Sequence, residues 1–233
     1  MHRPVLTIAD EVVARIGAQK ADELRERTRT FTCCECGAPG RADREEASVV
    51  LVASSVLSRL GVAHHRCSGS RAVDVGPGEI TFSGPTDLVP RAIGLHTTSG
   101  DRAALLLAYE EDVTAYDESG AGYEPVVSHF LAAGLHRLVS LGRAPAASPR
   151  WSVEAGPGDR LVVTSGREAV LSDATMYAPS VWLAMAADQG AVALIVGRLD
   201  RDDIYAPAPP MAAYAAAIRS GRLVGGTVPI TVR

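Results

Sequence analysis

Lysine, aromatic residues and long apolar runs are all scarce in this sequence. Lys20 is the only lysine, 5% of the 233 residues are aromatic, and no uninterrupted apolar run approaches the roughly 20 residues that a membrane-spanning helix requires. Near the N-terminus, Asp10 and Glu11 interrupt the stretch in which the apolar part of a secretion signal would lie. These absences predict a soluble cytoplasmic protein with no membrane partner, and the preference for arginine over lysine is typical of bacterial genomes rich in G and C.

Common catalytic and nucleotide-binding motifs are also missing. The chain contains no G-x-G-x-x-G, no G-x-x-x-x-G-K-[ST] and no G-x-S-x-G, which argues against a dinucleotide site, a P-loop and a serine-hydrolase elbow. The net charge is −4, and the acidic excess lies after residue 71. This larger part of the chain would repel a phosphate backbone, so a general nucleic-acid-binding surface there is not expected.

The cysteines that are present lie close together. Three of the four fall within the stretch FTCCECGAPG, where Cys33 and Cys36 have C-x2-C spacing and Gly37 follows directly. The fourth, Cys67, comes three residues after His64 in AHHRC. Two thiolates at C-x2-C spacing can bind one ion from a tight turn, and the segment before His64 is long enough for a β-hairpin that returns the second pair to the first.

This pattern predicts a zinc site with four protein ligands, Cys33, Cys36, His64 and Cys67, because Zn²⁺ prefers a tetrahedral set of nitrogen and sulfur atoms. Cys34 and His65 each lie beside a predicted ligand and could replace it. Four protein ligands would leave no open position for a catalytic water, and no H-x-E motif of the zinc-deaminase type is present.

Other uses of the cysteines carry less weight. A disulfide is disfavoured in a chain without an export signal, whereas a redox-sensing site, with Cys34 as a spare thiol, stays open as an alternative.

Residues 31–70 resemble the treble-clef and zinc-ribbon-like fingers, in which a CxxCG knuckle, a β-hairpin and a second ligand pair hold one structural zinc. The resemblance implies a metal and a local fold. It implies no activity, because such fingers occur in proteins of many functions.

The rest of the sequence predicts an α+β fold. Apolar spacing indicates an amphipathic helix from Ile8 to about Thr30, and a change in Gly and Pro content suggests two domains, 1–71 with the helix and finger and 72–233 with α+β character. Residues 100–143 and 158–198 open with similar turns and predict two hairpin-helix units, which arose either by duplication or by convergence on the same turn residues. The expected strands are 48–53, 57–62, 102–109, 112–116, 161–164, 169–171, 191–196 and 227–232, and the expected later helices are 125–141, 179–188 and 210–220.

The function expected from the sequence is that of a non-enzymatic zinc protein that binds a protein partner or a second copy of itself. The first alternative is nucleic-acid binding through the finger, whose arginines could contact phosphates. The second alternative is an enzyme with a pocket in the C-terminal domain, for which the sequence names no catalytic residue.

Overall fold

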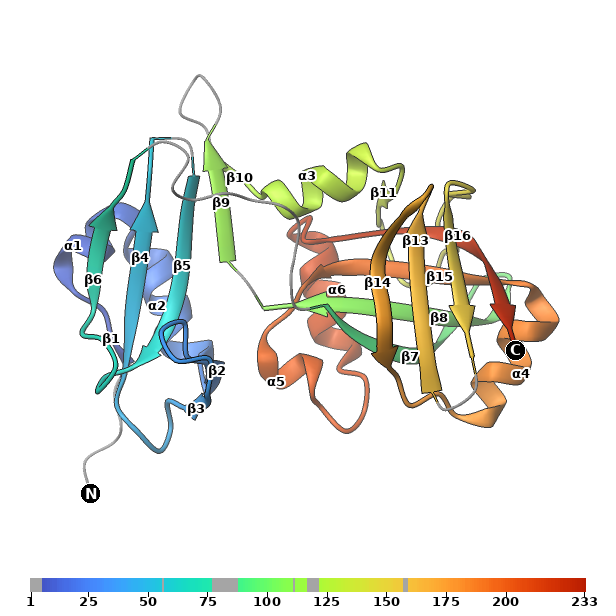
Figure 1. Cartoon of the computed structure of the whole chain (residues 1–233), viewed down its shortest axis with the longest axis horizontal. Helices are drawn as coiled ribbons and strands as arrows, with labels where there is room; N and C mark the ends of the chain where they lie inside the picture. Colours follow the sequence, from blue (N-terminus) through green and yellow to red (C-terminus); the bar gives the residue numbers. More distant parts are fainter. Residues whose placement is uncertain (1–5, 56, 77–87, 111, 117–121, 157–158) are drawn as a thin grey trace. The chain divides into compact units, whose positions relative to one another are not determined.

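The computed structural model describes residues 6–55, 57–76, 88–110, 112–116, 122–156 and 159–233, and Figure 1 traces their elements. Part of the Gly- and Pro-rich segment at the expected domain boundary lies outside these residues. The described residues form two compact units. The first unit is not one stretch of chain, because it combines Met1–Ser83 with Glu110–Pro125 and Asp200–Tyr205.

The first unit is built on a mixed sheet whose main strands run in the order β1 (Leu6–Thr7), β4 (Ala47–Ala53), β5 (Leu57–His64), β9 (Asp112–Tyr116) and β10 (Gly122–Tyr123). A further strand, β6 (Arg71–Asp74), pairs with β4 in parallel. The valine-rich strand β4 pairs with β5 as the expected antiparallel hairpin. The short strands β2 (Thr30–Thr32) and β3 (Pro39–Arg41) form a separate two-stranded sheet.

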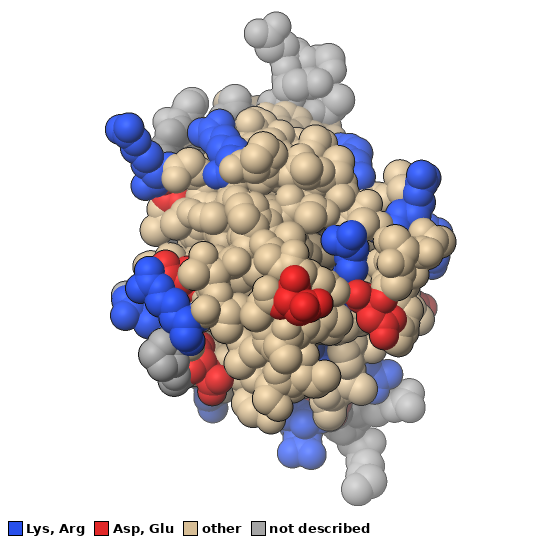
Figure 2. Space-filling model, turned by 90° about the vertical axis from the view of Figure 1, so that its right-hand side faces the viewer, with Lys and Arg blue, Asp and Glu red and all other residues tan. Residues whose placement is uncertain are grey.

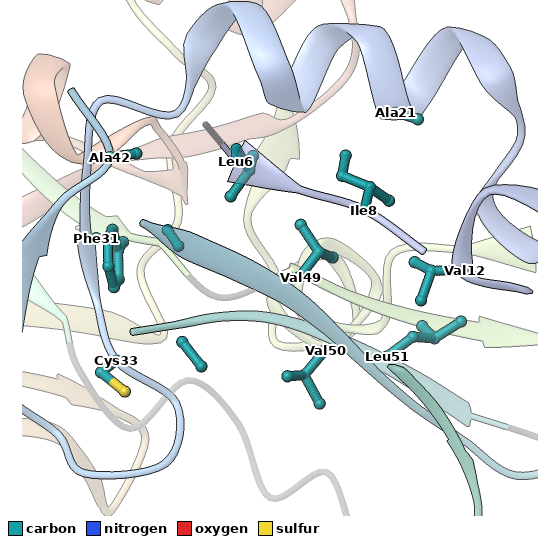
Figure 3. Packing of buried hydrophobic residues seen from close by; sticks show 12 residues of the cluster. Leu6, Ile8, Val12, Ala21, Phe31, Cys33, Ala42, Val49, Val50 and Leu51 are labelled. Atoms are coloured by element: carbon teal, nitrogen blue, oxygen red, sulfur yellow. The ribbon is translucent and has the colours of Figure 1, made fainter. Parts of the chain in front are cut away.

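Two helices cover one side of this sheet where the sequence predicted one. The chain forms α1 (Asp10–Ile16) and α2 (Ala18–Arg27), and Gly17 between them has φ of +83°. Only glycine adopts this conformation without steric cost, so it breaks the helix. As Figure 3 shows, side chains from both helices then reach one core with Leu6 of β1 and residues of β4; its buried members include Ile8, Val12, Ala21, Val49 and Leu51.

The second unit contains a larger mixed sheet. Its strands run in the order β14 (Glu168–Thr175), β13 (Arg160–Ser165), β12 (Trp151–Ala155), β16 (Leu223–Val232), β15 (Ala191–Arg198), β8 (Gly100–Tyr109) and β7 (Val89–Thr97), and β11 (His136–Arg137) also pairs with β16. In Figure 1, β13 and β14 run steeply across the direction of β8 and β15, which shows how strongly the sheet twists.

The helices that follow in the second unit are α3 (Pro125–Ala132), α4 (Ser180–Gln189) and α6 (Met211–Arg219). Helix α5 (Arg201–Ile204) belongs to the first unit. Helix α4 packs against β8, β15 and β16. The buried indole of Trp182 anchors it, because Nε1 donates to the carbonyl oxygens of both Ile93 (3.1 Å) and Ala104 (3.0 Å) on the neighbouring strands β7 and β8.

The structure contains both helices and sheets, as an α+β fold requires, and most of the expected strands lie where the sequence placed them. The first of the two expected hairpin-helix units does not form. Strand β8 pairs with β7 and β15, whereas β9 leaves for the sheet of the first unit. The helix expected over 125–141 ends at Ala132, and Gly134 with φ of +93° turns the chain into β11. Between residues 160 and 198 the chain forms the strands β13 and β14, then α4 and then β15.

Among the described residues, no helix has the length and hydropathy that crossing a bilayer would require.

Candidate metal centre

The four predicted ligand residues meet at one point of the first unit. The ligand atoms of Cys33, Cys36, His64 and Cys67 all lie within 4.8 Å of one another, and no other such group occurs among the described His, Cys, Asp and Glu side chains. The first pair lies in the turn that connects β2 to β3. His64 is the last residue of β5, and Cys67 lies in the turn that follows.

Backbone hydrogen bonds fix each turn. In the first, the amide of Cys33 donates to the carbonyl of Ala38 (2.9 Å) and the amide of Gly37 donates to the carbonyl of Cys33 (2.8 Å). Gly37 has φ of +71°, the left-handed conformation that favours glycine and that lets this turn close. In the second turn, the amide of Cys67 donates to the carbonyl of His64 (2.8 Å), which brings the thiol beside the imidazole.

The two turns are joined to each other through the edge of β5. Cys33 forms an isolated parallel bridge with Val62, and the amide of Cys34 donates to the Val62 carbonyl (2.9 Å). The amide of His64 also donates to the sulfur of Cys33 (3.4 Å). The hairpin therefore sets the distance between the ligand pairs, as the sequence predicted.

The spacing of the ligand atoms fits a tetrahedral zinc ion. With Zn–S near 2.3 Å and Zn–N near 2.0 Å, a tetrahedron separates a ligating nitrogen from a ligating sulfur by about 3.5 Å. His64 Nδ1 lies 3.5 Å from Cys36 Sγ and 3.8 Å from Cys67 Sγ. These two nitrogen–sulfur distances are therefore compatible with one tetrahedral ion, to which His64 would offer Nδ1.

The other nitrogen of the same ring faces a carboxylate. His64 Nε2 lies 3.7 Å from Glu45 Oε1, an oxygen that also accepts a hydrogen bond from the amide of Arg41 (3.0 Å). A carboxylate on the far nitrogen is the usual partner of a metal-binding histidine, because it orients the ring and favours the tautomer that leaves Nδ1 free. The ring also contacts Phe31, with 5.2 Å between ring centres.

The thiols differ in their acidity and in their exposure. Burial tends to raise the pKa of Cys33, but hydrogen bonds from the amides of Cys36, His64 and Glu35 outweigh it and lower the pKa to about 6. For Cys67, loss of solvent and hydrogen bonding with the thiols of Cys36 and Cys33 raise the pKa. Cys33 and His64 are buried, whereas Cys36 and Cys67 are exposed. The lowered pKa favours the thiolate form of Cys33, which is the form that binds metal.

The two neighbours that could have replaced a ligand point elsewhere. His65 is exposed, and its Nδ1 lies 2.8 Å from the hydroxyl of Ser48. The Cys34 thiol lies over Gly61, where a Cβ atom would come within 2.9 Å of the sulfur, and the loss of solvent around it raises its pKa to about 11. Neither residue belongs to the four-residue cluster.

Residues 6–76 match the family model described as "SCO1756-like putative zinc-binding domain". No curated protein and no solved structure matches the chain. The matched region extends on both sides of the predicted finger and includes α1 and α2, which pack on the sheet, and β6, which is one of its strands. The prediction of a zinc-binding module is confirmed, and Zn²⁺ is the cofactor that the Cys₃His cluster fits.

Sequence reasoning missed the residues that support this centre. The roles of Glu45 and Phe31 depend on how β2, β3 and the following turn fold over His64, and neither residue belongs to a recognisable motif. Nothing in the sequence indicated that residue 40 must be glycine, although a Cβ atom there would overlap the Phe31 ring and lie 2.8 Å from His64 Nε2.

Proposed function

We propose that the first unit binds one structural Zn²⁺ through Cys33, Cys36, His64 and Cys67, and that the protein acts through its surfaces and not through catalysis. The observation that carries the proposal is the convergence of these four ligand atoms from two separate turns, with nitrogen–sulfur distances of 3.5 and 3.8 Å. When bound, the ion supplies a cross-link between the β2–β3 turn and the end of β5.

Two features favour a structural over a catalytic role for the ion. Four protein ligands complete a tetrahedron, whereas catalytic zinc sites keep a position for water or substrate. The Glu45 carboxylate lies 3.7 Å from the outer nitrogen of His64 and accepts a hydrogen bond from the Arg41 amide, so it is placed beside Nε2 and not among the four ligand residues.

The surface of the second unit supports an interaction role. Figure 2 looks onto the end of this unit that carries α4, and uncharged side chains cover most of that face. Tyr177 and Val181, just before and within α4, are 79% and 72% exposed. Exposed aromatic and aliphatic side chains on an uncharged surface are typical of contacts between proteins, so we propose a protein partner or a second copy of this chain.

Nucleic-acid binding through the finger is the less favoured hypothesis. Of the arginines that could contact phosphates, Arg25, Arg27, Arg41 and Arg71 are paired with Asp22, Asp200, Asp43 and Glu35. These carboxylates offset the positive charge that a phosphate backbone would need.

The zinc assignment is tested by measuring metal content in single variants of the full chain. Cys33→Ser, Cys36→Ser, His64→Ala and Cys67→Ser should each lose most of the bound zinc, and the first unit of these variants should unfold or aggregate because the ion is needed to fix its turns. Cys34→Ser and His65→Ala are matched controls that change the neighbouring residue, and both should keep one zinc per chain.

A cobalt-substituted sample adds a readout that does not depend on yield. Thiolate-bound tetrahedral Co²⁺ gives a strong visible absorption, which should persist in the two controls and weaken in the four ligand variants. Full zinc content in Cys67→Ser, or loss of zinc in His65→Ala, would contradict the ligand set.

A further inference from the structure

Strand β2 leads into the metal centre and has two distinct faces. Successive side chains of a strand point to opposite sides, so Phe31 faces away from Thr30 and Thr32. The Phe31 ring is buried against His64, and Cys33 follows the strand directly. One face of β2 is therefore part of the candidate zinc site, and the two threonine hydroxyls lie on the other.

The threonine face holds α5, which is far away in the sequence. Thr30 Oγ1 donates to Asp202 Oδ1 (2.5 Å), and Arg201 Nη1 donates to Thr32 Oγ1 (2.6 Å). At the start of the same segment, Asp200 forms an ion pair with Arg27 of α2 (2.5 Å). Every one of these contacts joins α5 to β2 or to the helix just before it.

Arg201 is the centre of this attachment. Its Nη1 atom also donates to Glu110 Oε1 (2.6 Å), and its guanidinium lies 4.8 Å from the centre of the Tyr205 ring. Only about a quarter of the Arg201 side chain is exposed (23%), so its hydrogen bonds are partly shielded from water. Arg201 thereby ties Thr32, Glu110 and its own segment together.

Among the described residues, β2 pairs with β3 over three residues, and a two-stranded hairpin of this length is marginally stable in water. The buried Phe31 ring and the bridge between Cys33 and Val62 also anchor the strand, so the ion adds a cross-link to these contacts. The ion would hold the strand through Cys33 and would also fix His64, against which Phe31 packs. Without the ion, β2 keeps the packing of Phe31 but loses the cross-link through Cys33, so the threonine hydroxyls are held less rigidly for α5.

We propose that zinc occupancy controls the docking of α5, so that the metal centre and the α5 attachment form one coupled switch. This inference rests on the proposed zinc site and adds a consequence of metal binding beyond the finger itself. The chain on both sides of α5, Leu199 and Ala206, belongs to the second unit, so metal loss frees a segment that begins and ends there. Linkage requires the reverse as well: docked α5 must strengthen zinc binding.

The first measurement is amide hydrogen exchange on the full chain, with and without zinc. Peptides that cover residues 199–206 should exchange slowly in the zinc-loaded protein and much faster after a chelator removes the ion. Peptides of β15 in the second unit provide the internal reference and should change little. Equal exchange of residues 199–206 in both states would overturn the proposal.

The second measurement uses the zinc-loaded protein and does not depend on how the metal-free chain folds. In Arg201→Ala, zinc transfer to a competing chelator should become about three- to tenfold faster, since two or three partly exposed polar contacts are lost. Arg201→Lys, which keeps a donor near Thr32, should fall between the two. The matched control is Arg15→Ala, which removes an ion pair to Asp74 in the same unit on α1 and β6.

The two proposals fail in different ways. If the unmodified protein binds no zinc, the proposed function falls and the switch falls with it. If it binds one zinc per chain through the four ligands, but Arg201→Ala releases the metal no faster than Arg15→Ala, the switch alone is wrong.

Discussion

The substitution Gly40→Ala probes how tightly the metal centre is packed. Gly40 lies opposite Phe31 in the β2–β3 pair. An added Cβ atom would overlap Phe31 Cζ, lie 2.7 Å from Phe31 Cε2 and lie 2.8 Å from His64 Nε2. Real Cβ atoms do not approach so closely, so the phenyl and imidazole rings must both move. Overpacking of this kind costs about 1–3 kcal/mol of folding free energy.

Zinc affinity should fall together with stability. A displaced His64 ring moves Nδ1 out of the tetrahedral position and moves Nε2 relative to Glu45, and disturbing the outer partners of a metal ligand typically weakens metal binding about 10- to 100-fold. The assays are urea unfolding of the zinc-saturated protein and competition with a chelator of known affinity.

The control for this prediction is Gly69→Ala in the same module. No atom lies within 4 Å of a Cβ placed at residue 69, and its φ is not in the left-handed region, so alanine should be tolerated there. If Gly40→Ala matched Gly69→Ala in both the unfolding midpoint and zinc affinity, the packing of Phe31 and His64 described above would be refuted.

Two further predictions concern the second unit. Trp182→Phe removes the indole N–H that donates to two carbonyl oxygens and should lower the free energy of unfolding by about 1–2 kcal/mol. Tyr177→Phe, at an exposed position, should leave it unchanged. Chemical denaturation of both variants measures the difference. Gly190→Ala places a side chain at φ of +60° where α4 ends and should lower the free energy of unfolding by about 1 kcal/mol in the same assay. The control Gly94→Ala, with no positive φ and open space around the residue, should lower it clearly less. Equal losses in the two variants would show that the conformation of residue 190 is not the cause.

The ligand cluster could be predicted because its signal is local. C-x2-C and H-x2-C fix the geometry within each turn, and the runs of Val and Leu in β4 and β5 indicate the hairpin that joins them. The H-x2-C spacing favoured His64 as a ligand but left His65 open. At the end of β5, His64 is buried beside Phe31, whereas the ring of His65 lies within hydrogen-bond distance of the Ser48 hydroxyl.

The partners of β9 and α5 could not be predicted, because strand pairing and docking over long sequence distances leave no pattern within either segment. Residues 102–109 and 112–116 look like two arms of one hairpin, yet β8 and β9 belong to different sheets. The break at Gly17 is an intermediate case. The glycine was visible as a weak point in the helix, but only its conformation of φ +83° shows that two helices form.

The assembly of the first unit from three separated segments also determines how it is completed during synthesis. All four candidate metal ligands precede β9 and α5 in the chain, so they are synthesised before the segments that complete the first unit. A nascent chain can therefore capture its ion early, while the edge of β5 that later pairs with β9 still exposes unpaired amides and carbonyls. Until residues 112–116 are translated, that edge is open to strands of neighbouring polypeptides and to chaperones.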